Sequence, residues 1–289
     1  SIDDLFAKIS SETKSNIIES IFRIFSGESI NLPVTLIRRY AEIVMQIAFK
    51  TKSPTETLVR VLGLSSQENS ATLLGLLALQ TYCEFINEDS FLQKNQESIV
   101  TFLEKNLQHP TLEIKIESIF ALTLLFSHLK EESVAHLLVP LLSNMTTLLV
   151  ATVRDNAEDR GLKILESFHE LLENHAKIFE KETEALLFVF SELMDTEGVS
   201  DSLRISSMQL IVLLCEKNTV AVKRSPTFAQ KILPIFFKVL TFTQSESLDE
   251  GSASLSKVVY GTSNDAQTEN RLTGAVIDAI SQMSVALSA

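Results

Sequence analysis

Apolar residues recur at intervals of three and four along most of the chain, which is the spacing of amphipathic α-helices. Short polar breaks divide this pattern into segments of helical length. The pattern predicts helices over 12–25, 33–50, 54–64, 68–87, 91–107, 110–129, 132–153, 157–174, 177–194, 201–217, 226–243 and 269–287.

Local signals agree with several of these helix starts. Proline costs nothing in a first helical turn because the N–H it lacks would have no partner there. Such prolines are Pro33, Pro54, Pro110 and Pro226. Asp201 and Ser225 stand just ahead of apolar runs and are predicted to cap the helices that follow.

The predicted helices form pairs whose second members begin near 33, 68, 110, 157 and 201, a spacing of roughly 35 to 47 residues. This period is typical of repeat arrays in which each helical hairpin packs on its neighbours. The sequence therefore predicts an all-α HEAT-repeat solenoid, a right-handed superhelix of about six antiparallel helix pairs. The expected single array covers 1–289, with approximate repeats 10–50, 54–87, 91–129, 132–174, 177–217 and 226–287 and an insertion loop at 244–268.

Two finer features favour HEAT repeats in particular. Pro140 and Pro234 stand in the middle of predicted first helices, where a proline is kept only if a bend suits the packing. Arg38 and Arg204 open second helices in which small residues follow at the spacing that lets neighbouring helices approach closely.

Composition supports a helical, soluble protein and narrows its partners. Eight glycines and six prolines are too few for the many turns of a sheet-rich fold of 289 residues. The net charge of −12 disfavours direct nucleic-acid binding, which needs clustered Lys and Arg. An acidic surface attracts basic partners, although it also serves simply to keep a protein soluble.

No catalytic, metal or cofactor site is predicted. The glycines form no phosphate-binding loop, and none of the histidines stands four residues from a second His or Cys. Cys83 and Cys215 lie far apart in apolar segments, which indicates buried free thiols in a reducing compartment. The chain shows no membrane-spanning run and opens without a signal-peptide pattern, so cytosol or nucleus is expected.

Several stretches together resemble the importin-β (karyopherin-β) family of nuclear transport receptors, and within it the importin-five branch. The stretches are 14–19 and 38–43 near the start, 203–216 in a central second helix, and 229–234 followed by an insertion and 269–272. The order of a proline-bearing helix, an acidic insertion and a final helix carries most of this resemblance, which covers nearly the whole chain.

The resemblance implies a nuclear import receptor that shuttles between cytoplasm and nucleus through the nuclear pore. Its expected partners are Ran-GTP and basic cargo, such as ribosomal proteins or histones, on the concave second helices. Phe-Gly nucleoporins are expected in apolar slots between the convex first helices. No membrane insertion and no direct nucleic-acid contact are implied.

Two sets of residues are candidates for these contacts. Phe188, Phe190, Phe236 and Phe237 could line a Phe-Gly slot, although the core is the commoner place for each ring, since most of the 17 Phe must lie inside. Glu246, Asp249 and Glu250 in the insertion loop could contact Ran or cargo. The chain contains no Trp, so the Trp–Asn cargo ladders of some family members cannot be carried over.

Two other classes of function stay open at this point. A HEAT scaffold of another kind, such as a phosphatase regulatory subunit or a chromosome or trafficking adaptor, would have the same repeat pattern, because fold does not fix function. An enzyme built on paired helices is the third possibility, and it would require a polar cluster that the sequence does not reveal.

Overall fold

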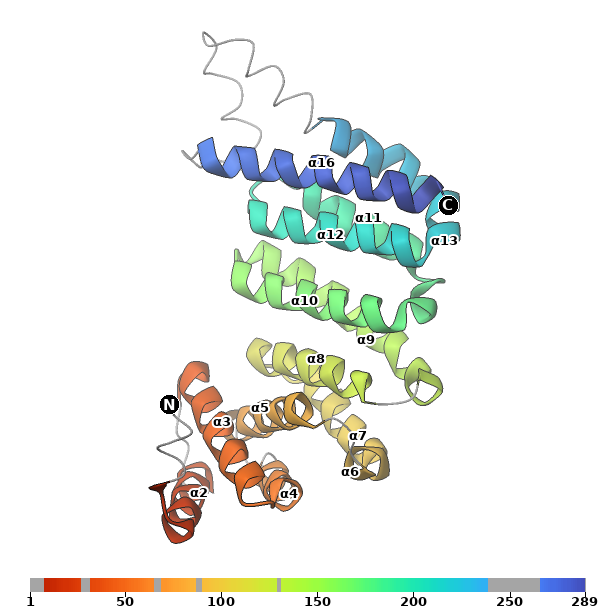
Figure 1. The fold of residues 1–289 in the computed structure, drawn as a ribbon. Coiled ribbons are helices and arrows are strands. Elements are labelled where there is room, and N and C mark those ends of the chain that lie inside the picture. The colour runs from red at the N-terminus through yellow and green to blue at the C-terminus, as the bar shows by residue number, and fades with distance from the viewer. Residues whose placement is uncertain are drawn as a thin grey trace. The chain divides into compact units, whose positions relative to one another are not determined.

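The computed structural model describes residues 8–26, 32–64, 69–86, 90–128, 131–238 and 266–288. Within these ranges all regular structure is helical, as the sequence predicts (Figure 1). The chain divides into two compact units, Ser1–Val134 and Ala135–Ala289, which are described separately.

Unit 1 is a stack of antiparallel helices. In chain order they are α2 (Ser11–Ser26), α3 (Val34–Lys50), α4 (Pro54–Leu64), α5 (Asn69–Phe85), α6 (Ser90–Lys94), α7 (Gln96–Leu107) and α8 (Leu112–Ser127). The second helices α3, α5 and α8 pack successively on one another, while α4 packs against α5 and α7 against α8. This is the packing that a series of stacked helical hairpins requires.

Helix α5 is the interior helix of unit 1. Every residue from Ala71 to Cys83 is buried, because α3, α4 and α8 all pack against this helix. The sequence of α5 fits this position, since it carries no charged residue before Glu84 and is apolar around most of its circumference.

A polar network crosses the three second helices of unit 1. Arg38 on α3 donates from Nη2 to Glu117 Oε1 on α8 at 3.0 Å and from Nη1 to Gln80 Oε1 on α5 at 3.5 Å. Gln80 Nε2 in turn donates to Oε2 and to the backbone oxygen of Glu117, each at 2.9 Å. A buried carboxylate is costly unless it is paired and hydrogen-bonded, so this network makes the burial of Glu117 tolerable.

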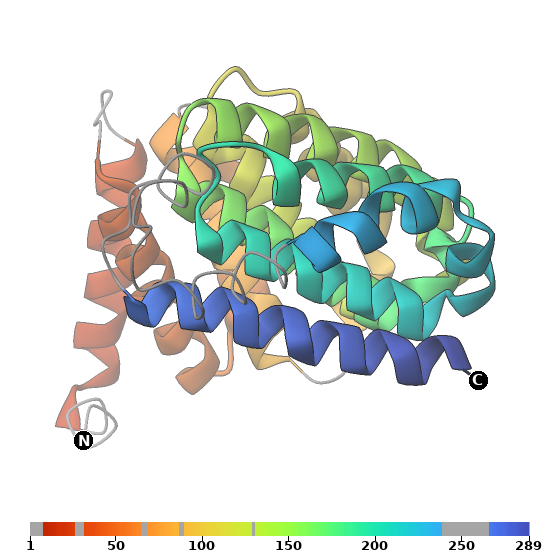
Figure 2. The same ribbon diagram turned by 90° about the horizontal axis from the view of Figure 1, so that it is seen from above.

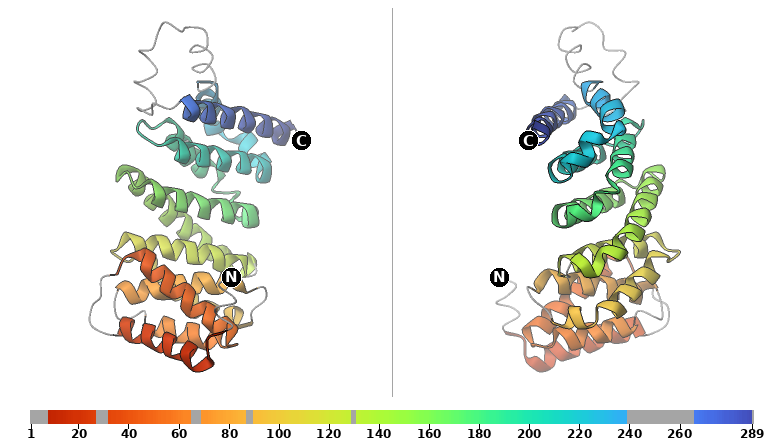
Figure 3. Two further views of the ribbon diagram at one scale, coloured as in Figure 1. Left: turned by 60° about the vertical axis from the view of Figure 1, so that its left-hand side comes forward. Right: turned by 90° about the vertical axis from the view of Figure 1, so that its right-hand side faces the viewer.

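Unit 2 repeats the same plan. Its elements are α9 (Glu131–Arg154, which begins just before the unit boundary), α10 (Glu158–His175), η1 (Ala176–Phe179), α11 (Thr183–Asp195), α12 (Asp201–Lys217), α13 (Thr219–Arg224), a helix over 226–238 that contains η2 (Phe228–Ile232), and α16 (Ala266–Ser288). The second helices α10, α12 and α16 form one layer (Figures 2 and 3). α12 packs between α10 and α16, and α11 covers α12 from the first-helix layer.

The turn from α11 into α12 is held by a buried arginine. Arg204 donates from Nε to the backbone oxygen of Val199 at 3.0 Å and from Nη2 to that of Thr196 at 2.9 Å. The chain reverses at Gly198, whose φ of 82° lies in the left-handed region that glycine adopts without strain. Arg204 therefore supplies the hydrogen-bond donors that these two backbone oxygens need once they are shielded from water.

The interior proline of the 226–238 helix coincides with a change of helical register. Residues Phe228–Ile232 form a π-helical turn, and the N–H of Leu233 bonds to the oxygen of Phe228. Pro234 follows directly; it has no N–H and its ring would crowd the preceding turn of a regular α-helix. The wider π-turn relieves this conflict. α9, by contrast, continues as α-helix through Pro140.

Most predicted helices are confirmed within a few residues, and 54–64 and 201–217 match their observed bounds. Three details were wrong. The predicted helix 91–107 is broken at Asn95, the predicted helix 177–194 begins as 3₁₀ and becomes α11 only at Thr183, and the short helix α13 was missed.

The helix starts were predicted less well than the helices. The cap of α12 is Ser200, whose side chain accepts the N–H of Leu203, and Asp201 is instead the first helical residue. Ser225 does cap its helix by accepting the N–H of Phe228. Pro33 occupies the N-cap position of α3 rather than its first turn. The insertion 244–268 lies almost wholly outside the described residues, and the repeat boundaries stay a prediction.

Replacing Arg38 by Ala should destabilise the chain by about 1–3 kcal/mol, because Glu117 would lose its charged partner while it stays buried. The matched control is Arg39→Ala, since the Arg39 side chain is 75% exposed against 37% for Arg38 and pairs only within its own helix in the contact described. Arg39→Ala should change stability by about 0.5 kcal/mol or less. Urea denaturation followed by circular dichroism measures both, and equal midpoints for the two variants would contradict the structural role of Arg38.

The thiol of Cys215 should be almost inert in the folded protein. Burial raises its pKa from 9.0 to about 12, and the neighbouring Glu216 carboxylate adds to the rise. The thiolate is the reactive form, so its population at pH 8 falls by about a thousandfold. Cys83 is buried as well. We expect iodoacetamide to label neither thiol quickly until guanidinium is added; rapid labelling of Cys215 in a native Cys83→Ala variant would refute this.

Candidate functional site

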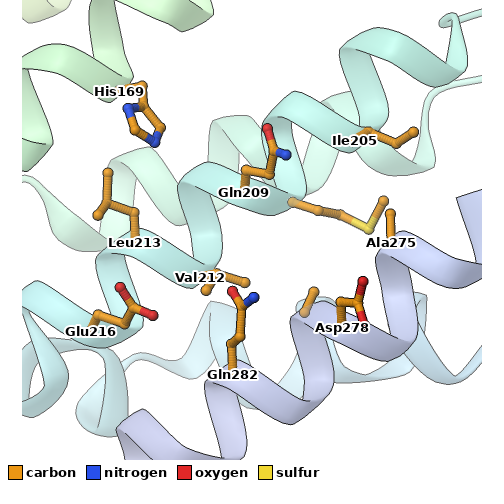
Figure 4. Close-up of a pocket in the computed structure, with 11 residues that line it drawn as sticks. His169, Ile205, Gln209, Val212, Leu213, Glu216, Ala275, Asp278 and Gln282 are labelled. Atoms are coloured by element: carbon orange, nitrogen blue, oxygen red, sulfur yellow. The ribbon is translucent and has the colours of Figure 1, made fainter.

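A groove of about 390 Å³ lies along the second-helix layer of unit 2, chiefly between α12 and α16 (Figure 4). Its lining comprises His169 from α10, then Ile205, Met208, Gln209, Val212, Leu213 and Glu216 from α12, and Ala275, Asp278, Ala279 and Gln282 from α16. Four of its lining residues, Gln209, Glu216, Asp278 and Gln282, are exposed to solvent.

Helical spacing explains why the groove has an apolar floor and a polar rim. Met208 and Val212 on α12 are buried and stand four residues apart, and Ala279 faces them from α16. Gln209 and Glu216 stand seven residues apart on the exposed side of the same helix, so both lie at the rim. On α12 and on α16, the boundary between the buried apolar face and the exposed polar face therefore runs along the groove.

The rim carries hydrogen-bonding and negatively charged groups. Two carboxylates, Glu216 and Asp278, and two amides, Gln209 and Gln282, surround the opening (Figure 4). None of the lining residues is Lys or Arg. His169 stands at one edge, with its Nδ1 3.7 Å from the carboxylate of Glu173. Carboxylates attract a cation, while amides both donate to and accept from a peptide backbone.

The four residues of the predicted Phe-Gly slot divide between the core and the surface, and the slot itself stays a prediction. Phe190 and Phe236 are fully buried, and Phe190 packs edge-on against Phe168 with ring centroids 5.5 Å apart. Phe188 and Phe237 are 49% and 58% exposed. The reason is helical geometry, because residues one or two positions apart point in different directions around a helix.

Polar contacts join the two first helices that carry these exposed rings. From α11 to the 226–238 helix, Glu184 accepts from the Thr227 hydroxyl at 2.5 Å and Asp195 pairs with Lys238 at 3.2 Å. Between these two contacts Lys231 pairs with Glu192. The Lys231 ammonium also lies 4.3 Å from the centroid of the Phe188 ring.

Several of these residues were not singled out in the sequence. Gln209, Glu216, Asp278 and Gln282 are ordinary polar residues on helix surfaces, and the sequence signal was only that they share exposed faces of second helices. Nothing in the sequence marked Lys231 as a contact residue, because its partner Glu192 stands on the preceding first helix, far from it along the chain. The loop candidates Glu246, Asp249 and Glu250 lie outside the described residues.

No group of three or more His, Cys, Asp or Glu side chains is placed to hold a metal ion in the part of the chain that the structure describes. In the same residues, no helix has the length and apolar character needed to cross a bilayer.

Comparison with known proteins gives a family. A family model described as "IPO5-like, TPR repeats" matches residues 38–189, which is more than half of the chain. Except between α3 and α5, the described second helices begin at intervals clearly longer than the about 34 residues of TPR repeats, which agrees better with HEAT repeats. A search of curated protein sequences finds no match.

Solved structures of Kap121p share the fold. Kap121p itself matches with a TM-score of 0.70 and 15% identity over 99% of this chain and 27% of Kap121p. Kap121p bound to RanGTP matches with a TM-score of 0.70 and 16% identity over 97% of this chain and 26% of that protein. Kap121p bound to Nup53p matches with a TM-score of 0.62 and 13% identity over 96% of this chain and 30% of that protein. The chain thus spans about a quarter of the length of these proteins. Through its IPO5-like repeats and this all-α HEAT-solenoid fold, the chain belongs to the importin-β (karyopherin) family.

Proposed function

We propose that this chain is part of a nuclear import receptor, and that the groove between α12 and α16 takes a basic segment of its protein cargo. Family membership supports a transport receptor. Structures of Kap121p bound to Pho4p, to Ste12p and to the C-terminus of Cdc14p show that a protein with this fold binds other proteins and short protein segments.

The chemistry of the groove rim is the observation that carries the cargo proposal. Lysine ammonium groups of one extended segment would be attracted by the carboxylates of Glu216 and Asp278, and the lining contains no Lys or Arg to oppose them. Gln209 and Gln282 could bond the backbone of the same segment. The net charge of −12 would draw a basic partner towards the chain over a longer distance. Ribosomal proteins and histones are basic cargo of the kind proposed.

The other proposed partners follow from the family. Ran-GTP would compete with cargo, and Phe-Gly nucleoporins would bind weakly at exposed first-helix rings such as Phe188 and Phe237, with many repeats adding avidity. Glu246, Asp249 and Glu250 are kept as proposed contacts to Ran or cargo. The receptor would move between cytoplasm and nucleus through the nuclear pore. We assign it no catalytic step and no cofactor.

Removing the two groove charges should weaken the binding of a lysine-rich peptide. In the double variant Glu216→Gln, Asp278→Asn, the loss should be roughly threefold to tenfold at low salt, because exposed ion pairs are individually weak and screened by salt. Fluorescence anisotropy with a labelled peptide measures it. The double variant Glu180→Gln, Glu197→Gln removes the same charge from exposed sites outside the groove lining and should bind nearly as wild type. Equal losses in both variants would point to net charge rather than to the groove.

Binding to Ran separates a transport receptor from another HEAT scaffold. The complete receptor containing this chain should bind Ran loaded with GTP much more tightly than Ran loaded with GDP, as measured by biolayer interferometry. Equal or absent binding to the two forms would rule out the transport function. In that case the groove would belong to a phosphatase-type or trafficking scaffold with a basic partner.

A further inference from the structure

We propose that Lys231 acts as a gate over the Phe188 ring and lowers the affinity of this first-helix surface for phenylalanine side chains. The inference rests on the proposed binding of Phe-Gly segments. It adds a residue that regulates this binding, and it arises from the contacts of Lys231 rather than from the ring itself.

Lys231 is held over the ring by two attractions at once. Its ammonium lies 4.3 Å from the Phe188 centroid, within the range of a cation–π contact. The same ammonium pairs with Glu192, which stands four residues after Phe188 and therefore on the same face of α11. A phenylalanine that stacked on this side of the ring would have to displace the ammonium, and an uncharged Phe-Gly segment offers it no replacement anion.

A cation, a carboxylate and a phenylalanine ring also meet in unit 1, but there the ring is buried. Arg60 on α4 lies 4.4 Å from the centroid of Phe22 on α2 and makes two hydrogen bonds to Glu19, at 2.8 and 3.3 Å. Phe22, however, is only 5% exposed, so it presents no ring to a ligand. There the cation simply joins two first helices, whereas at Phe188 it covers a ring that is half exposed.

The neighbouring contacts allow Lys231 to move without separating the helices. The Thr227–Glu184 and Lys238–Asp195 contacts join the same two helices on either side of Lys231. The side chains of Lys231 and Glu192 are themselves partly exposed, at 31% and 51%. Moving Lys231 away from the ring therefore breaks only a surface ion pair and a cation–π contact. The apparent affinity for a phenylalanine side chain is then the affinity of the uncovered ring multiplied by the fraction of time that the ring is uncovered.

The test uses Lys231→Met, which keeps an unbranched apolar side chain and removes the charge. We expect it to raise the affinity for a synthetic Phe-Gly repeat peptide by about threefold to tenfold in titrations followed by NMR chemical shifts. A Ser-Gly peptide of equal length should not bind. Lys231→Arg keeps a cation over the ring and should bind like wild type. Arg60→Met should leave peptide affinity unchanged, because Phe22 stays buried.

Salt gives a second, independent reading. Added NaCl screens the Lys231–Glu192 pair, so peptide affinity should rise with salt more steeply in wild type than in Lys231→Met. Parallel salt curves for the two proteins would overturn the gate.

Phe188→Ala distinguishes failure of the gate from failure of the docking site. If Phe188→Ala weakens peptide binding while Lys231→Met leaves it unchanged, the ring is a docking site and the gate is wrong. If Phe188→Ala has no effect on peptide binding, the proposed docking at this ring is wrong, and the gate fails with it. Circular dichroism of each variant checks that the helices remain folded.

Discussion

Within each unit, the structure depends on the packing of each second helix against the next. α5 in unit 1 is buried from Ala71 to Cys83, and α12 in unit 2 packs against α10, α11 and α16. A helical hairpin of this kind cannot bury its apolar residues by itself, so each one needs its neighbours. This requirement keeps the second helices aligned side by side, and the groove forms where α12 and α16 meet.

Buried polar groups then restrict how the helices can stack. Apolar contacts tolerate small shifts, but a hydrogen bond does not, and an unpaired buried charge is costly. Arg38, Gln80 and Glu117 connect three successive second helices in unit 1. In unit 2, Arg204 ties the start of α12 to the turn before it. Each network adds a directional contact at a place where the apolar packing alone would permit sliding.

The two helix layers of unit 2 therefore present different chemistry to solvent. The second-helix layer exposes carboxylates and amides around an apolar floor, which suits a basic, extended protein segment. The first-helix layer exposes phenylalanine rings beside lysine–carboxylate pairs, which suits weak apolar contacts that charges can modulate. Neighbouring repeats thus form one surface in each helix layer, because the two helices of a pair lie in different layers.

The sequence by itself determined the helices and their pairing, since apolar spacing and scarce glycine and proline reflect local geometry and burial. It also indicated the importin-β family. Only the tertiary structure decided which phenylalanines are core and which are exposed, because neighbouring positions such as Phe236 and Phe237 differ only in direction around the helix. It alone brought Glu216 and Asp278 to the lining of one groove and Lys231 near Phe188, because these residues stand on different helices and their placement depends on how the helices stack.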